Sequence, residues 1–235
     1  MPGVTSATPK QDRPALSRER VVEAALVVID ERGIDGFTMR RLGAALGADP
    51  MSAYLHFANK AQLLDAVVEH QAARLRQLPD LDVTDVVEMI VEIGRFNRGI
   101  LLEHPNLVPL LASRPLPQAT ASEDVVNGVD VLRAAGFADA DIPMVFGALV
   151  TFTFGYVLHE AQREDRHRDL GETFARQQQA LVDQMVALDR DTTVAQEVIA
   201  RRLRPDHGEE GFICGLRAML LGLRAGLGAA PSGSG

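Results

Sequence analysis

Few side chains in this 235-residue chain are spaced for acid/base or metal chemistry. His104, His159 and Glu160 are the candidates, but adjacent residues diverge by about 100° on a helix, so His159 and Glu160 cannot easily share a metal ion. No His-Glu-x-x-His, glycine-rich phosphate loop or serine-nucleophile motif occurs. A helical-bundle enzyme is therefore a remote alternative, and we expect no catalytic residue, no metal site and no cofactor.

The cysteine content and the apolar runs bear on the compartment. Cys214 is the only cysteine and stands in an apolar stretch. A single cysteine cannot form an internal disulfide or a metal site with several thiolates. A thiol in an apolar stretch usually serves as inert packing. The longest uninterrupted apolar runs fall well short of the ~20 residues of a membrane span, and no signal-peptide pattern opens the chain. We therefore expect a cytoplasmic protein that makes no membrane contact.

The distribution of charge leaves room for a nucleic-acid partner despite a net charge of −8. Residues 1–60 carry eight Lys and Arg against seven Asp and Glu, whereas the remainder carries sixteen against twenty-five. Affinity for DNA depends on the charges at the contacted phosphates and not on the total. A DNA-binding N-terminal segment on an acidic body is compatible with this composition.

Apolar residues recur every three or four positions along nearly the whole chain, which predicts an all-α protein of about nine to ten helices. Four helices should begin near Ser17, Thr38, Asp49 and Asn59, all residues that favour the N-cap. Gly47 provides a short turn between the second and third. This spacing is typical of a helix-turn-helix. Periodicity alone leaves open a plain three-helix bundle with a short connector.

A helix that reads DNA needs one face against its scaffold and another against the bases. Ala53 and Phe57 can pack inward against Leu42 and Leu46, which turns the rest of the third helix outward. Helix N-termini also favour phosphate. The outward face is poor in Arg, Asn and Gln. The residues predicted to contact DNA are Thr38, Met39, Arg40, Pro50, Met51, Ser52, Tyr54, Leu55, His56 and Lys60.

The C-terminal part should hold a dimer interface. A charged loop is expected at residues 164–168, followed by helices at 173–188, 193–203 and 208–227. The last helix carries an apolar stripe beside glycines that permit close helix approach. With the apolar helix 141–162 and the same two helices of a second subunit it would form a four-helix interface, the alternative being burial within one subunit. The predicted interface residues are Phe212, Leu216, Met219, Leu220, Leu223 and Leu227.

Several stretches carry a family resemblance. Gly36-Phe37-Thr38-Met39-Arg40-Arg41-Leu42, Leu46-Gly47, Ser52-Ala53-Tyr54-Leu55-His56-Phe57 and Asn59-Lys60 resemble the DNA-binding domain of TetR-family repressors over residues 17–66. Ser113-Arg114-Pro115, residues 152–158 and residues 212–216 are similar to the tetracycline repressor subgroup. The resemblance implies a homodimeric repressor that binds a palindromic operator and is released by a small-molecule inducer. A transcriptional activator and a ligand-independent regulator with the same DNA-binding head are the alternatives.

The resemblance also implies a domain plan and a pocket. We expect a flexible arm at 1–15, the DNA-binding domain at 16–62, a ligand-binding and dimerisation domain at 63–229, and a flexible tail at 230–235. Where the tetracycline-binding members place a histidine and a glutamate near Mg²⁺, this chain has Leu110 and His159, so magnesium–tetracycline is not the expected inducer. The residues expected around the ligand are Glu92, Phe96, Leu110, Ser113, Arg114, Asn127, Phe152, Tyr156 and His159.

Overall fold

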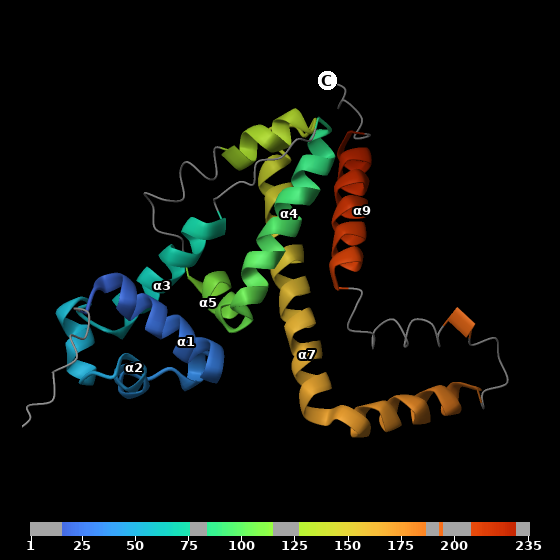
Figure 1. Cartoon of the computed structure of the whole chain (residues 1–235). Helices are drawn as coiled ribbons and strands as arrows, with labels where there is room; N and C mark the ends of the chain where they lie inside the picture. The colour runs from blue at the N-terminus through green and yellow to red at the C-terminus, as the bar shows by residue number, and fades with distance from the viewer. Residues whose placement is uncertain (1–15, 76–83, 115–126, 187–192, 195–207, 229–235) are drawn as a thin grey trace, which may run out of the picture. The chain divides into compact units, whose positions relative to one another are not determined.

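The computed structural model describes residues 16–75, 84–114, 127–186, 193–194 and 208–228 (Figure 1). All regular secondary structure in these ranges is helical, which confirms the all-α prediction. The expected arm at 1–15, the tail at 230–235 and most of the expected helix 193–203 lie outside the described residues. Besides a helical segment at residues 127–134, the elements are α1 (Arg18–Gly36), α2 (Met39–Leu46), η1 (Pro50–Leu55), α3 (Lys60–Leu75), α4 (Val86–Glu103), η2 (Pro105–Leu107), α5 (Val108–Ser113), α7 (Ile142–Val186) and α9 (Gly208–Gly228).

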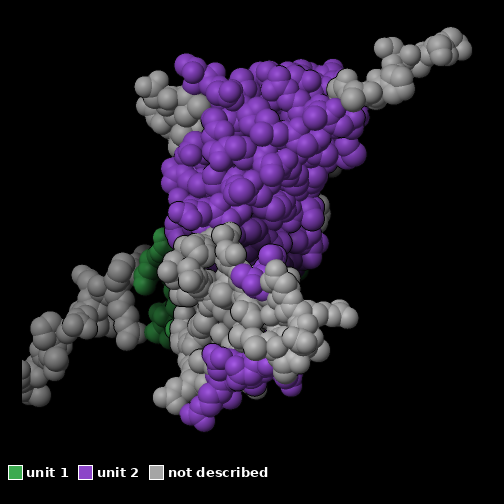
Figure 2. All heavy atoms as spheres, turned by 90° about the vertical axis from the view of Figure 1, so that its right-hand side faces the viewer, with its two compact units in different colours: residues 1–67 green, residues 68–235 purple. Residues whose placement is uncertain are grey.

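The chain divides into two compact units, residues 1–67 and 68–235, coloured separately in Figure 2. The division falls inside α3, which belongs to the first unit up to Val67 and to the second from Val68. In the first unit, Ser17 caps α1 by accepting from the Arg20 N–H at 3.3 Å. Gly33 interrupts that helix with φ 68°, a left-handed conformation that glycine adopts without steric cost.

The core of the second unit lies where α4, α7 and α9 run beside one another (Figure 1). Gly94 of α4 permits close packing of α9, because a Cβ there would collide with the Leu216 side chain. Replacing this glycine would therefore force the Leu216 side chain to move. The fully buried part of the cluster comprises Val87, Ile90, Val91, Leu132, Ala135, Phe137, Ile142, Val145, Phe212, Leu216 and Leu220.

Helix α7 is longer than the sequence pattern predicts and bends along its length (Figure 1). The prediction of a loop at residues 164–168 is wrong, since the backbone is helical through to Val186. No proline or glycine stands between residues 164 and 170, and the arginines, the glutamate and the leucine of this segment are good helix formers.

The first part of α7, Ile142–Arg163, is long and apolar enough to cross a membrane by length and composition, and only 22% of it is buried within the chain. A core helix of a soluble protein passes the same test. The uninterrupted apolar runs understate the length of this apolar segment, because glycines and threonines separate its apolar residues without adding charge. Much of its surface is therefore uncovered in the single chain.

Candidate nucleic-acid interface and ligand region

The turn between α2 and η1 is built by local capping. The Thr38 hydroxyl at the start of α2 accepts from the Arg41 N–H at 3.3 Å. At the other end, Gly47 adopts φ 60° and its N–H reaches the Ala44 carbonyl at 3.1 Å. A left-handed glycine is the common end of a helix. The turn therefore redirects the chain directly into η1.

The element after the turn is a 3-10 helix and not the α-helix that the spacing predicts. The Asp49 carboxylate accepts from the Met51 N–H at 2.8 Å, and the Ser52 N–H bonds to the Asp49 carbonyl three residues back. Pro50 stands in the first turn, where its missing N–H costs nothing. The tighter coil still turns Ala53 and Phe57 fully inward, at 0% and 1% exposure.

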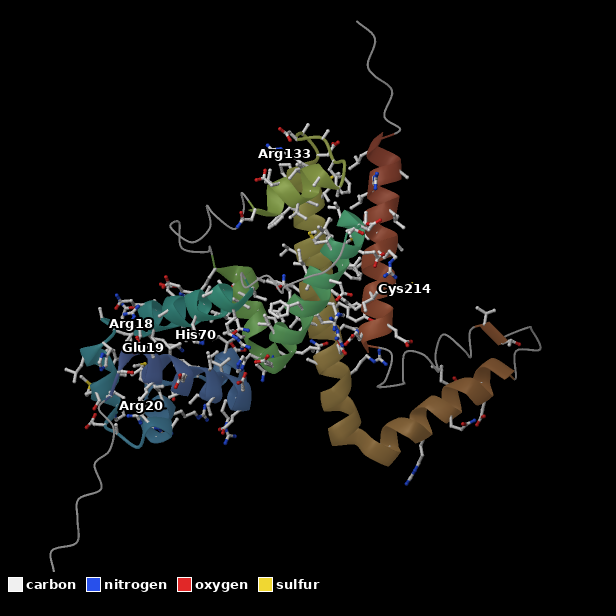
Figure 3. All side chains as sticks on the ribbon, turned by 45° about the horizontal axis from the view of Figure 1, so that its top comes forward. Arg18, Glu19, Arg20, His70, Arg133 and Cys214 are labelled. Atoms are coloured by element: carbon white, nitrogen blue, oxygen red, sulfur yellow. The ribbon has the colours of Figure 1, made fainter. Side chains whose placement is uncertain are left out.

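Two further contacts anchor η1. The Arg18 guanidinium of α1, labelled in Figure 3, lies 4.4 Å from the centre of the Phe57 ring. It also donates to the His56 carbonyl at 3.3 Å. Gly43 of α2 admits the ring of Pro50, since a Cβ there would lie 2.8 Å from Pro50 Cγ. The orientation of η1 is therefore fixed by packing from both α1 and α2.

The predicted DNA-contacting residues lie on or near the outside of this unit. Leu55, Met51 and Tyr54 expose 83%, 65% and 38% of their surface. Thr38, Arg40 and Lys60 are also exposed, whereas Met39, Pro50, Ser52 and His56 are half-buried. Thr38 and His56 additionally serve the fold, through the α2 cap and through the carbonyl that Arg18 contacts.

Lys60 has a structural contact that the sequence does not reveal. Its ammonium donates to the Phe37 carbonyl at 2.8 Å and lies 5.2 Å from the centre of the Phe37 ring. Asn59 caps the same helix by accepting from the Gln62 N–H at 2.9 Å. The start of α3 is thereby tied to the entry of α2, and an ammonium has two further donors that remain available to a phosphate.

In the second unit, Phe152 and Tyr156 of α7 meet Phe212 of α9. Phe152 and Tyr156 have ring centroids 5.7 Å apart, and Phe212 lies 5.5 Å from Phe152 and 5.3 Å from Tyr156. Burial away from water, with a smaller contribution from the nearby Glu160 carboxylate, raises the pKa of Tyr156 above its ordinary value of 10.0. Tyr156 therefore stays a neutral phenol over the physiological range.

A buried ion pair adjoins these rings, and sequence reasoning missed its cation. Arg98 of α4 pairs with Glu160 of α7 through two hydrogen bonds, with the Nε to Oε2 distance at 2.9 Å and side-chain exposures of 8% and 12%. The Glu160 carboxylate lies against Gly208 at the start of α9, where a Cβ would collide with it. A carboxylate is favoured at a helix N-terminus, so this pair joins α4, α7 and α9.

Two family models match the chain, one for each region described above. The model described as "Bacterial regulatory proteins, tetR family" matches residues 21–67, and the model described as "Tetracyclin repressor-like, C-terminal domain" matches residues 78–227. The second match alone covers more than half of the chain.

The chain belongs to the TetR family.

Individual relatives agree with this assignment. The HTH-type transcriptional repressor DrrR1 of Streptomyces coeruleorubidus is 26% identical, over 90% of this chain and 78% of its own length. The class D tetracycline repressor protein of Escherichia coli is 27% identical, over 90% and 91%. The crystal structure of the Streptomyces coelicolor TetR-family protein ActR in complex with actinorhodin superposes with a TM-score of 0.69 at 25% identity, covering 92% of this chain and 98% of that one. TetR-family proteins are DNA-binding regulators and not enzymes, so the enzyme alternative is set aside.

The residues expected around the ligand of this TetR-family regulator lie in different environments. The structure brings Phe152 and Tyr156 together, and it buries Leu110 to 6% exposure. Ser113, Asn127 and His159 are exposed in the single chain. Glu92, Phe96 and Arg114 are half-buried, and the Glu92 carboxylate accepts from Arg95 at 2.8 Å. Of this set only Leu110 is fully buried, whereas Phe152 and Tyr156 are half-buried and pack against the core of the second unit.

The chain does not fit the magnesium ion of the tetracycline-binding members. Leu110, at the position where the resemblance places a metal-binding histidine, is a buried hydrocarbon side chain, and His159 offers nitrogen where Mg²⁺ prefers oxygen. Among the described residues, no three His, Cys, Asp or Glu side chains are grouped to hold a metal ion. We assign no role to magnesium.

The six residues of α9 that the sequence analysis assigns to the dimer interface fall into two groups that differ in burial. Phe212, Leu216 and Leu220 are at most 1% exposed within one subunit and belong to its own core, as in the alternative of intramolecular burial. A residue that is fully covered in its own chain cannot contact a partner. Met219, Leu223 and Leu227 are half-buried at the edge of this core. Cys214, expected as inert packing, is instead exposed, and Figure 3 labels it on α9.

Proposed function

We propose that this TetR-family regulator is a cytoplasmic repressor that binds a palindromic operator as a homodimer and is released by a small organic inducer. The observation that carries the proposal is η1: two fully buried residues, Ala53 and Phe57, hold it in place while Met51 and Leu55 stand exposed. A rigid element whose outer side chains are free to enter a groove is what a helix-turn-helix presents to the major groove.

A dimer is supported by the uncovered faces of α7 and α9. Exposed residues recur at helical spacing as Met144, Gly147, Thr151 and Gly155 on α7, and as Cys214, Ala218, Leu221 and Ala225 on α9. Glycines on both helices, among them Gly147, Gly155 and Gly222, face open space, so a second subunit can approach closely. The interface we propose therefore uses Leu221 in place of the buried Leu220.

The inducer is proposed to bind in the second unit near Phe152 and Tyr156. ActR, a relative of 25% identity, has been crystallised with actinorhodin, and this supports an organic effector for the related fold. The ligand must bind one conformation of the dimer better than the other, because equal affinity for both would shift nothing. A difference of ~5.5 kcal/mol takes such an equilibrium from almost entirely one state to almost entirely the other.

Footprinting of the purified protein around its own gene, followed by a screen of metabolites for release of the footprint, tests this function. We expect a protected two-fold symmetric site with half-sites about one helical turn, ~34 Å, apart. A reporter gene behind that site should be repressed and then relieved by the releasing compound. Protection of no duplex at low ionic strength would contradict the proposal, and activation of the reporter would favour an activator.

A further inference from the structure

The outward side chains of η1 are dominated by hydrocarbon. Leu55, at 83%, is the most exposed large hydrophobic residue in the described part of the chain, and Met51 follows on the same short element at 65%. An exposed leucine loses the benefit of burial, which is worth roughly 25 cal/mol per Å² of apolar surface. These two side chains therefore gain most if a partner covers them.

The anchoring of η1 shows that these side chains face outward as a fixed pair. Ala53 and Phe57 are buried, the Asp49 carboxylate holds the Met51 N–H, and the Pro50 ring fits against Gly43. Rotation of η1 that would bury Leu55 would expose Phe57 and break its contact with Arg18. The apolar surface is thus a built feature of the reading element.

Neither side chain can read a base by a strong hydrogen bond. Leucine has no donor or acceptor, and the methionine thioether is only a weak acceptor. In the major groove the apolar feature that distinguishes one base from the others is the C5-methyl group of thymine. Building on the operator binding proposed above, we propose that Met51 and Leu55 select the operator by packing against thymine methyl groups.

The surroundings favour DNA over a protein as the partner of this surface. The intervening Ser52 and Tyr54 carry hydroxyl groups, and Arg40 of α2 and Lys60 of α3 are exposed cations. Hydroxyls and cations suit phosphate and base edges. The core of a protein interface is, in contrast, depleted of charge.

Removal of single methyl groups from the DNA tests the proposal. Duplexes bound by the full-length protein are selected from a random palindromic pool, and each thymine of the best duplex is replaced in turn by deoxyuridine, which differs only in that methyl. Burying one such carbon is worth ~0.8 kcal/mol, so we expect about fourfold weaker binding at each contacted thymine. Thymines outside the footprint serve as controls and should show no change.

Protein variants then assign each methyl to its side chain. Leu55→Ala and Met51→Ala should each bind more weakly and become insensitive to deoxyuridine at one thymine while keeping the response at the others. Val27→Ala, at an exposed position of α1, is the matched control and should behave as the parent protein.

The outcomes separate the two proposals. If no duplex is enriched, operator binding and methyl selection both fail. Enrichment of a duplex in which no deoxyuridine weakens binding would leave operator binding intact and overturn methyl selection. Methyl selection would also be overturned if Leu55→Ala kept full methyl sensitivity and changed only the oligomeric state, because that result would make Leu55 a protein contact.

Discussion

At the scale of single residues, several side chains serve both the fold and the function proposed for it. Lys60 ties α3 to the entry of α2 through the Phe37 carbonyl and is also proposed to contact a phosphate. Tyr156 meets the Phe212 ring edge-on and is kept neutral by burial. A variant at such a position changes stability and binding together, so the experiment must separate the two.

Lys60→Met removes the charge and keeps an unbranched stem over the Phe37 ring. We expect binding to weaken similarly for all duplexes, and the slope of log affinity against log salt to fall by about one, because one phosphate contact is lost. A salt titration by fluorescence anisotropy measures this slope. Lys60→Arg keeps the charge and is the control. An unchanged slope in Lys60→Met would refute the phosphate contact.

Tyr156 can be titrated almost in isolation, since the chain holds two tyrosines and no tryptophan. In Tyr54→Phe the tyrosinate absorbance reports Tyr156, and we expect a midpoint above 10.0 because burial disfavours the charged phenolate. A pKa raised in the folded state means that the associated stability is complete below the unfolded pKa and is lost as pH rises through the folded value. Tyr156→Phe should abolish that alkaline loss. A midpoint at or below 10.0 would show that the ring is solvated.

At the scale of elements, close approach and ionic contacts decide how the helices pack. Gly43 lets η1 lie on α2, and Gly94 lets α9 lie on α4. The Arg98–Glu160 pair joins α4 to α7, and Glu209 at the start of α9 approaches Arg98 at 3.6 Å. Through Arg98, α4 is thus linked both to α7, which is proposed to bind the inducer, and to α9, which is proposed to contact the second subunit.

Gly43→Ala should destabilise the first unit. The new Cβ would lie 2.8 Å from the Pro50 backbone nitrogen, and backbone cannot move aside as a flexible side chain can. We expect a loss of about 1–3 kcal/mol in chemical denaturation, the usual cost of overpacking. Gly99→Ala, at a helical glycine with no neighbour within 4 Å, is the control and should be neutral or gain up to about 1 kcal/mol. Equal effects of the two changes would argue against the α2–η1 contact.

Arg98→Met should be costly because it leaves the Glu160 carboxylate buried without its cation. Breaking one partner of a buried ion pair typically costs about 3–5 kcal/mol, whereas replacing both can be nearly neutral. The double variant Arg98→Met with Glu160→Gln should therefore recover most of the loss in a urea titration. Equal losses in the single and double variants would indicate that the pair is solvated and weak.

At the scale of the whole molecule, the C-terminal unit leaves apolar surface of α7 and α9 exposed. Only 22% of Ile142–Arg163 is buried, and α9 exposes Leu221 to 49%. A second copy that covers α7 and α9 would complete this surface, and it would also set the separation of two reading elements on DNA.

Leu221→Glu should shift the protein toward monomer in sedimentation equilibrium, because it places a charge within the proposed apolar interface. It should leave the subunit fold unchanged, since Leu221 lies outside the buried cluster. Val27→Glu, a similar change on α1 at 51% exposure, is the control and should remain dimeric. A Leu221→Glu protein that stays dimeric at low concentration would place the interface elsewhere.

The helical class and the helix starts of the N-terminal unit could be predicted from the sequence, because both depend on local chemistry. The 3.6-residue period and the caps at Ser17, Thr38, Asp49 and Asn59 act within a few residues of one another. The inward position of Ala53 and Phe57 followed from the same periodicity. The resemblance to the TetR family then indicated that the N-terminal unit binds DNA.

The partner that each apolar helix face packs against could not be predicted from the sequence. Periodicity shows that Phe212, Leu216 and Leu220 share a face, but burial against the subunit or against a second copy leaves the same pattern. The contacts of Arg98 with Glu160 and of Lys60 with Phe37 join residues 62 and 23 positions apart, so no local signal announces them. Short-range energetics fix the helices, whereas the assignment of their faces depends on which distant segments fold against them.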